Sequence, residues 1–239
     1  MKNRKVWRIV VCVMLIVFQF SNGNYLRAQS DTLATLSPLP EGGEDVLLQN
    51  GFSGASLSEN ITMASTSAGL IGLGLLAAYQ PDVNSWAVNL RDEVMYHNPP
   101  KLTFDNQLQY LPAITPAVLN LCGVKGRHDF KRLVLLEGGS YLLGAGWLNA
   151  FKYGFAKERP DSSTKNSFPS GHTFTAFVGA EIIRREYGKE YPWLAVAGYA
   201  VATLVGVMRI YNNRHWAGDV LAGAGLGILS TTLVYWALD

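Results

Sequence analysis

The sequence predicts an all-α protein built as a bundle of membrane helices. Hydrophobic residues make up 49% of its 239 residues and charged residues only 16%, well below the ~25% of charged residues typical of soluble domains. The chain also contains 24 glycines, and small residues allow close helix contact in lipid, where apolar burial alone does not drive association. The formal net charge of +2 is too small to indicate nucleic-acid binding.

The N-terminal part predicts an export signal followed by a polar arm. Residues 1–28 begin with a basic region and continue with an apolar run, Ile9–Phe20, that is too short for an ordinary span. Leu26–Ala28 offers a cleavage site, and an uncleaved anchor is the alternative. Residues 29–60 are rich in Ser, Gly, Pro, Asn and acidic side chains, which predicts a linker or loose arm. Residues 61–239 are then expected to form the membrane domain.

Three candidate helices occupy the first half of this domain. Thr62–Tyr79 is apolar, rich in small residues and just long enough to cross a bilayer. Val83–Tyr96 has the pattern of an amphipathic interfacial helix that stops before the Pro99-Pro100 pair. Leu111–Val124 is apolar but short, and it contains two prolines.

Four clearer helices fill the second half, and with the earlier candidates they predict about five to six membrane helices. They are expected at Leu133–Phe151, His172–Tyr187, Pro192–Tyr211 and Trp216–Trp236. Glycines recur along the first and the last of them, as expected for helices in close contact within lipid. Tryptophans stand near the ends of several segments, where interfacial anchors are found.

The lengths of these helices bring a set of polar residues to one membrane face. The first helix ends at Lys152, a polar loop leads to the start of the second at Ser170, and the third returns to end near Arg209. The residues collected at this face are Lys152, Arg159, Ser170, His172, Arg209, His215 and Asp219.

The sequence also predicts the surroundings of six charged residues that do not belong to this set. Three more cations on the same face are expected to be solvated or to contact a substrate head group: Lys157, Lys165 and Arg214. Three residues at the far end of the second helix are expected to extend to the opposite interface: Glu181, Arg184 and Arg185.

The collected residues form a cationic pocket against apolar helices, which suits an oxyanion and phosphate best. Arginine offers planar, paired donors, and lysine supplies a point charge. The turn Pro169–His172 opens a helix, whose free backbone N–H groups and positive dipole end favour an anion. Gly171 allows the backbone to approach such a ligand closely.

The two histidines have different expected roles. His215 and Asp219 are four residues apart at the start of a helix and therefore share a face. The carboxylate can keep one imidazole nitrogen protonated, which leaves the other free to attack phosphorus. His172 can then protonate the leaving oxygen. Because no second carboxylate cluster or His/Cys set has metal-ligand spacing, neither a metal nor another cofactor is expected.

Three motifs in this set resemble the type 2 phosphatidic acid phosphatase (PAP2) family. They are Lys152-Tyr-Gly-Phe-Ala-Lys-Glu-Arg159-Pro160, Pro169-Ser170-Gly171-His172 and Arg209-Ile-Tyr-Asn-Asn-Arg-His215-Trp-Ala-Gly-Asp219. Their order and spacing agree with the family pattern K-x6-RP, PSGH and SR-x5-H-x3-D, apart from Met208, where the family often has serine. The resemblance covers roughly Lys101–Trp236 and implies a PAP2-type bundle of membrane helices.

The resemblance implies a role for each matched residue. His215 would form a phosphohistidine intermediate, Asp219 would orient it, and His172 would act as general acid and then as base. The phosphoryl oxygens would be bound by Lys152, Arg159, Ser170, Gly171 and Arg209. Family members are integral-membrane lipid phosphatases, soluble acid phosphatases or vanadium haloperoxidases, and the apolar helices favour the first.

The run from Lys152 to Trp236, together with the export signal, most resembles bacterial lipid A phosphatases of the 4′-phosphatase type. This resemblance implies a lipid phosphate in the membrane as the substrate, with the 4′-phosphate of lipid A as the leading candidate. Undecaprenyl pyrophosphate and phosphatidylglycerol phosphate are alternative substrates, while a vanadium-dependent haloperoxidase and a non-catalytic membrane scaffold are alternatives of another class. The far-side loops carry more lysine and arginine than the expected active face, which favours a periplasmic site in a bacterial inner membrane. The number of spans before Leu133 and the oligomeric state stay open.

Overall fold

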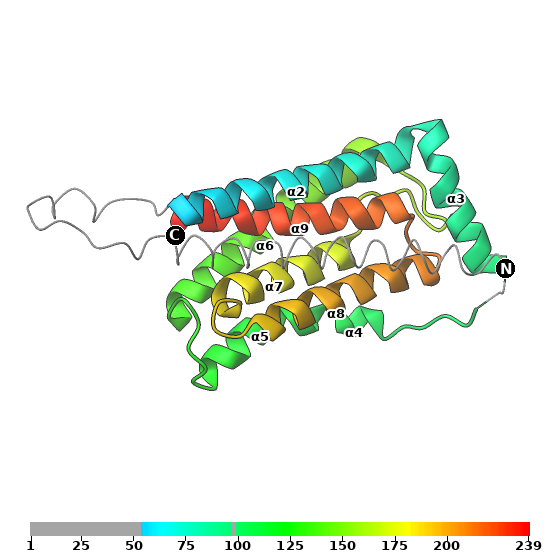
Figure 1. Ribbon diagram of the computed structural model, residues 1–239. Helices are drawn as coiled ribbons and strands as arrows, with labels where there is room; N and C mark the ends of the chain where they lie inside the picture. Colours follow the sequence, from blue (N-terminus) through cyan, green and yellow to red (C-terminus); the bar gives the residue numbers. More distant parts are fainter. Residues whose placement is uncertain (1–53, 97–98) are drawn as a thin grey trace, which may run out of the picture. The chain divides into compact units, whose positions relative to one another are not determined.

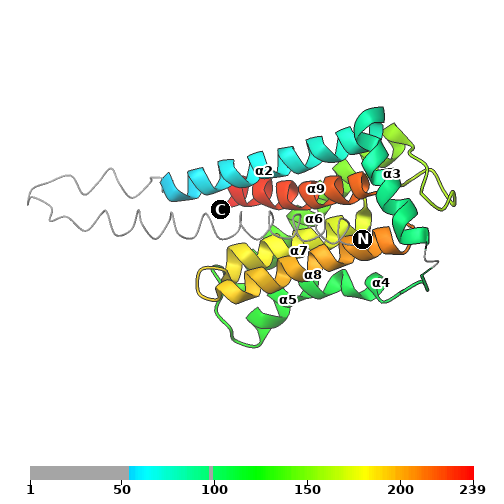
Figure 2. The ribbon, with the colours of Figure 1, turned by 45° about the vertical axis from the view of Figure 1, so that its right-hand side comes forward.

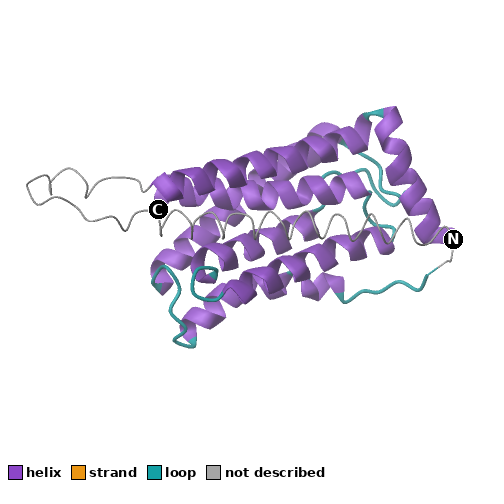
Figure 3. Cartoon of the chain, viewed as in Figure 1, coloured by secondary structure: helices purple, strands orange, loops and turns teal. Residues whose placement is uncertain are grey.

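The computed structural model describes residues 54–96 and 99–239, and every regular element among them is a helix (Figure 3). The expected all-helical class is therefore confirmed for this part of the chain. The predicted signal, 1–28, lies outside the described residues, as does the predicted arm as far as residue 53. The chain divides into two compact units, Met1–Thr62 and Met63–Asp239, and the second contains all the expected site residues.

Long helices run side by side in the second unit (Figures 1 and 2). They are the part of α2 (Gly54–Tyr79) that begins at Met63, α6 (Phe130–Phe155), α7 (Gly171–Tyr187), α8 (Pro192–Tyr211) and α9 (Ala217–Leu238). α7 is the central helix, because it packs against α8 and α9 and also contacts α5 and α6. Most of its residues are buried.

Three shorter helices complete the described part of the second unit. α3 (Pro81–Tyr96) crosses the end of the bundle and contacts α8. α4 (Asp105–Leu108) was not predicted from the sequence. α5 (Tyr110–Leu121) has 12 residues and is therefore about 18 Å long, too short for a hydrocarbon core of about 30 Å.

The helix boundaries follow the predictions closely, and the differences have local causes. α8 has the predicted bounds, whereas α2 begins at Gly54 rather than Thr62, so the last residues of the predicted arm are helical. α6 begins before the predicted residue because Asp129 caps it, accepting a hydrogen bond from the Arg132 backbone N–H at 2.8 Å. The cap accepts a hydrogen bond from a backbone N–H group that has no partner within the first turn of the helix. A prediction from hydropathy does not detect such a polar residue as a helix start.

Among the described residues, three helical stretches are long and apolar enough to cross a membrane: Leu57–Tyr79, α8 and α9. α6 and α7 pack against α9, and α7 carries charged residues in its last two turns. The chain is thus a membrane protein with a helical bundle, as the sequence indicated.

Glycines allow the helices around α9 to approach closely. A Cβ added to Gly223 would lie 2.5 Å from the backbone oxygen of Ser170, at the start of α7. A Cβ on Gly218 would lie 2.7 Å from the backbone oxygen of Gly74 in α2. Contacts this short are not available to any residue with a side chain, so the glycines predicted to serve helix packing do so here.

The charged end of α7 is buried, and the expectation that it extends to the interface is wrong. Glu181 is fully buried and accepts hydrogen bonds from Arg185 Nε at 2.7 Å and from Arg184 Nε at 2.8 Å. The hydroxyl of Tyr199 on α8 also donates to Glu181, and Arg185 Nη2 donates to Thr232 on α9 at 3.1 Å. The sequence places these charges together on α7 but gives no sign that α8 and α9 supply their partners.

Replacing Glu181 should strongly destabilise the bundle, because Glu181→Ala leaves two arginines without their shared buried carboxylate. We expect a loss of about 3–5 kcal/mol in the free energy of unfolding. Tyr199→Phe removes one hydrogen bond to a charged group and should cost about 1.5–3 kcal/mol. Thermal and denaturant unfolding in detergent would measure both, with the exposed Lys131→Ala as the control. Equal stability of Glu181→Ala and Lys131→Ala would refute the structural role of this cluster.

Candidate active site

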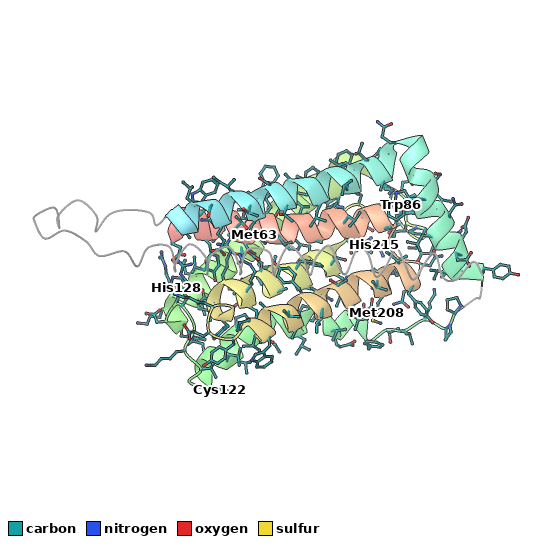
Figure 4. The ribbon with its side chains drawn as sticks, in the orientation of Figure 1. Met63, Trp86, Cys122, His128, Met208 and His215 are labelled. Atoms are coloured by element: carbon teal, nitrogen blue, oxygen red, sulfur yellow. The ribbon has the colours of Figure 1, made fainter. Side chains whose placement is uncertain are left out.

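The three sequence motifs meet at one end of the bundle. They lie at the end of α6 and in the loop that follows it, at the start of α7, and between α8 and the start of α9. Figure 4 places His215 at this end, near α3, and His128 at the opposite end. α6 ends at Phe155, where Ala156 adopts a left-handed conformation with φ of 43° and turns the chain into the polar loop.

His215 is held by one ring nitrogen. Its side chain is 2% exposed, and Nδ1 lies 2.8 Å from the backbone carbonyl oxygen of Ser167. A carbonyl oxygen can only accept, so Nδ1 carries the proton and Nε2 keeps its lone pair. Asp219 Oδ2 lies 3.6 Å from Nδ1, which is longer than a hydrogen bond. The carboxylate expected to orient His215 therefore acts on it through its charge.

Asp219 joins the polar loop to the start of α9. Its buried carboxylate accepts hydrogen bonds from the Ser167 hydroxyl and, at 2.9 Å, from the Trp216 backbone N–H. Lys157 Nζ donates to the other carboxylate oxygen at 3.1 Å. Because an unpaired buried charge is costly, these partners are what allow a carboxylate at this position.

The three cations outside the motifs differ from one another. Lys157 is not solvated, since its side chain is 12% exposed and pairs with Asp219. Its ammonium group also lies 5.6 Å from the ring centre of Trp216. Arg214 pairs with Asp161 at 2.9 Å, and Lys165 is exposed as expected.

Lys152 and Arg159 share a neutral partner. Lys152 Nζ donates to the backbone oxygen of Asn166 at 2.7 Å, and Arg159 Nε donates to its side-chain oxygen at 2.9 Å. Sequence reasoning missed Asn166, although it lies three residues before the Pro-Ser-Gly-His turn. Because Asn166 carries no charge, it positions both cations without neutralising them.

Arg209 is buried beside a carboxylate that the motifs do not contain. Its side chain is 5% exposed, and Nη1 donates to Asp105 Oδ2 at 2.6 Å. Its Nε atom is buried and has no hydrogen-bond partner among the described residues. Asp105 belongs to α4, which sequence reasoning missed because no periodicity or spacing marks a helix of four residues.

His172 and the turn before it open α7. His172 Nε2 lies 3.0 Å from the side-chain oxygen of Asn106, also in α4. Ser170 caps the helix: its hydroxyl oxygen accepts from the Thr173 hydroxyl at 2.9 Å, and its backbone N–H donates to the Asp219 carbonyl at 2.9 Å. The motifs are thus linked through both side chains and backbone.

Gly171 has space beside it. A Cβ added there would meet Leu148 at 3.6 Å, an ordinary contact. Packing within the described protein therefore gives no reason for glycine at this position. The close approach of a ligand to Gly171, which the sequence analysis expected, remains a prediction.

The electrostatics of the site keep His215 neutral at neutral pH. Its pKa lies at about 4, below the ordinary 6.5, chiefly because burial removes water from the charged form of the imidazole. The charge of Asp219 raises this pKa, whereas the charges of Arg209 and Arg159 lower it. The charges of these three residues therefore all act on the His215 ring. Nε2, the ring nitrogen that would attack phosphorus, is unprotonated at neutral pH.

The described residues, 54–96 and 99–239, contain no group of three or more His, Cys, Asp or Glu side chains that could hold a metal ion. Metal independence remains a prediction for experiment.

Nuclear magnetic resonance can test the protonation state of His215. The chain has four histidines, so ¹⁵N-histidine labelling gives a simple spectrum, and His215→Ala identifies the signals of interest. We expect His215 to be neutral with its proton on Nδ1 from pH 8 down to about pH 5, because its pKa is lowered to about 4. Titration near pH 6.5, or a proton on Nε2, would contradict the geometry described above.

The chain is similar in sequence to known proteins. Residues 135–239 match the model of the PAP2 superfamily. Over 137 residues, which are 56% of this chain and 31% of the relative, the chain is 48% identical to a protein named lipid A 1-phosphatase from Porphyromonas gingivalis. It is 35% identical over 96 residues, 37% of this chain and 46% of the relative, to phosphatidylglycerophosphatase B from Bacillus subtilis. The chain therefore spans less than half the length of these curated relatives.

A solved structure shares the fold. It is the transmembrane PAP2-type phosphatidylglycerolphosphate phosphatase from Bacillus subtilis, with a TM-score of 0.55 and 23% identity, covering 73% of this chain and 94% of that one. Residues 135–239, the part of the chain that matches the PAP2 superfamily model, include all three motifs.

Proposed function

We propose that the chain is a phosphatase that hydrolyses lipid phosphates in the membrane through a phosphohistidine intermediate. One observation carries this proposal: a neutral, buried histidine has its Nδ1 held by a backbone carbonyl and stands in the field of two arginines. Nucleophilic attack by histidine on phosphorus needs an unprotonated nitrogen and nearby positive charge, and His215 has both.

The reaction would proceed in two steps. In the first, Nε2 of His215 attacks phosphorus, the bond to the lipid oxygen breaks, and His172 in its protonated form gives its proton to that oxygen. The pKa of His172 lies at about 4 in the protein alone, chiefly because of burial and the charge of Arg209, and the negative charge of a bound phosphate would raise it. In the second, neutral His172 takes a proton from water, the resulting hydroxide attacks phosphorus, and the N–P bond breaks. Inorganic phosphate leaves, and His215 is neutral again.

Positive charge would stabilise the phosphoryl group in both steps. Lys152 and Arg159 are held by a neutral residue and keep their charge for an anion. Arg209 retains a buried Nε without a partner among the described residues. Ser170 and Gly171 would offer the start of α7, where backbone N–H groups favour an anion. Lys157 is already paired with Asp219, so we leave it out of the phosphate site.

Lipid A is the substrate that we propose. The membrane helices favour a lipid, and the Porphyromonas gingivalis relative is named for lipid A. That name refers to the 1-phosphate, whereas the sequence analysis favoured the 4′-phosphate. Which of the two phosphates is removed is therefore a question for experiment. Phosphatidylglycerol phosphate is the second candidate, supported by the name of the Bacillus subtilis relative. We propose a periplasmic site in the inner membrane, from the distribution of basic residues.

Trapping the intermediate tests the chemistry. After a denaturing quench at alkaline pH with radiolabelled substrate in excess chelator, the parent protein should carry a phosphate that is stable in base and lost in acid, and His215→Ala should carry none because Nε2 is missing. His215→Ala should also lose measurable turnover while retaining its unfolding temperature in detergent. Labelling of the variant at the parent level would exclude His215 as the nucleophile, and loss of parent activity in chelator that magnesium or zinc restores would exclude the metal-independent mechanism.

Mass spectrometry of lipid A tests the substrate. Loss of the gene should raise the mass of lipid A by one phosphate, and fragmentation would show whether the 1- or the 4′-position retains it. Because the extra phosphate makes the surface more negative, cells should become more sensitive to cationic peptides. The parent gene should reverse both effects, and the His215→Ala gene should not. Unchanged lipid A with accumulation of another lipid phosphate would exclude lipid A and keep the phosphatase.

A further inference from the structure

α4 contributes two polar side chains to the candidate site from outside the region that matches the family. The family match begins at residue 135, and α4 comprises Asp105–Leu108. Asp105 is 1% exposed and contacts Arg209, while the exposed Asn106 contacts His172. The two residues thus contact one expected phosphate-binding residue and the expected general acid.

The contact with Asp105 selects one edge of the Arg209 side chain. A guanidinium group has two N–H forks, and Asp105 binds Nη1, the terminal nitrogen nearest Cδ. The other fork, Nε with Nη2, is the one whose Nε is buried without a partner among the described residues. A bidentate contact to two phosphoryl oxygens needs such a fork held in place. The position of Asp105 is itself fixed, because Asn212 Nδ2 donates to its Oδ1 at 3.3 Å.

The contact with Asn106 selects one nitrogen of His172. The side-chain oxygen of Asn106 can only accept, so Nε2 of His172 carries a proton and donates it at 3.0 Å. The nitrogen that remains for exchange of a proton with a leaving group or with water is Nδ1. The amide of Asn106 therefore determines which atom of His172 performs the proton transfer.

We propose that Asp105 and Asn106 are positioning residues of the phosphoryl-transfer site. Asp105 aims the Nε–Nη2 fork of Arg209 at the phosphoryl group, and Asn106 fixes the ring of His172 so that Nδ1 faces the reacting oxygen. This inference rests on the proposed phosphatase function. The two residues have separable effects, because one acts through phosphate binding and the other through proton transfer.

The test compares three variants in full-length protein in detergent. Asp105→Asn keeps the shape of the side chain and removes its charge, Asn106→Ala removes the acceptor, and Gln107→Ala changes an exposed neighbour in the same short helix as the control. For each variant one measures kcat and KM on a short-chain lipid phosphate, inhibition by inorganic phosphate, and the unfolding temperature. If Asp105→Asn does not fold, Asp105→Glu, which keeps the charge but displaces it, replaces it.

Asp105→Asn should chiefly weaken phosphate binding, whereas Asn106→Ala should chiefly slow turnover. Asp105→Asn should weaken inhibition by phosphate about 10-fold and lower kcat/KM by about 10- to 100-fold, because a displaced guanidinium no longer matches the phosphoryl oxygens. Asn106→Ala should lower kcat at least about 10-fold with little change in phosphate inhibition, because it affects proton transfer. Asn106→Asp should restore turnover and shift the basic limb of the pH profile upward, because a carboxylate stabilises protonated His172.

A double-mutant cycle separates positioning from a general structural role. In an Arg209→Lys background, which has no guanidinium fork to aim, Asp105→Asn should cause little further loss of phosphate inhibition. If the losses of phosphate inhibition in the two single variants add up in the double variant, Asp105 does not act through Arg209. If phosphate inhibits Asp105→Asn more tightly than the parent, the Asp105 carboxylate competes with phosphate for Arg209. α4 variants that behave like Gln107→Ala, while His215→Ala remains inactive, would overturn this inference alone. A parent without phosphatase activity would instead overturn the proposed function.

Discussion

The buried carboxylate of Asp219 is the interaction on which the arrangement of the site depends. A charge without water needs opposite charge and hydrogen-bond donors around it. Lys157 supplies the charge, and the Ser167 hydroxyl and the Trp216 backbone N–H supply donors. These partners come from the polar loop and from the start of α9, so the same contacts that satisfy Asp219 also fasten the loop. The Ser167 carbonyl is thereby placed 2.8 Å from Nδ1 of His215, and the proposed nucleophile is oriented by a backbone group that the contacts of Asp219 hold in place.

The two ends of the bundle hold similar cationic side chains that have different partners. At the far end of α7, Arg184 and Arg185 share the single carboxylate of Glu181, so part of their positive charge is cancelled inside the bundle. At the other end, Lys152 and Arg159 are held by the uncharged Asn166, so their charge remains for an anion. Counting arginines and lysines does not distinguish these situations, because the difference lies in the partner. A cation held by a neutral group is therefore better evidence of an anion site than a cation in a complete ion pair.

The sequence predicted the features that depend on residues close together in the chain. Apolar runs with recurring glycines gave α8 its bounds and most of α6, α7 and α9, and motif spacing identified residues that the structure brings to one end of the bundle. The sequence did not show partners that come from distant segments. Asp105 lies 104 positions from Arg209 in a helix too short to leave a periodic pattern, and nothing near Glu181 indicates that Tyr199 faces it. Lys157, which lies inside a motif gap, was expected to be solvated or to contact a substrate head group, and spacing did not reveal its burial beside Asp219.

The two histidines are proposed to react through different ring nitrogens, because each ring donates its other N–H group to an uncharged oxygen. The Ser167 carbonyl accepts from Nδ1 of His215, and the Asn106 amide oxygen accepts from Nε2 of His172. A carboxylate in either place would fix the same tautomer, but it would also favour the protonated ring and cancel positive charge beside the phosphate. Protonation would remove the lone pair of Nε2 of His215, the proposed nucleophile. Neutral acceptors orient both rings while His215 stays unprotonated, and they add no negative charge beside the proposed phosphate site, a combination that favours attack on a phosphoryl group.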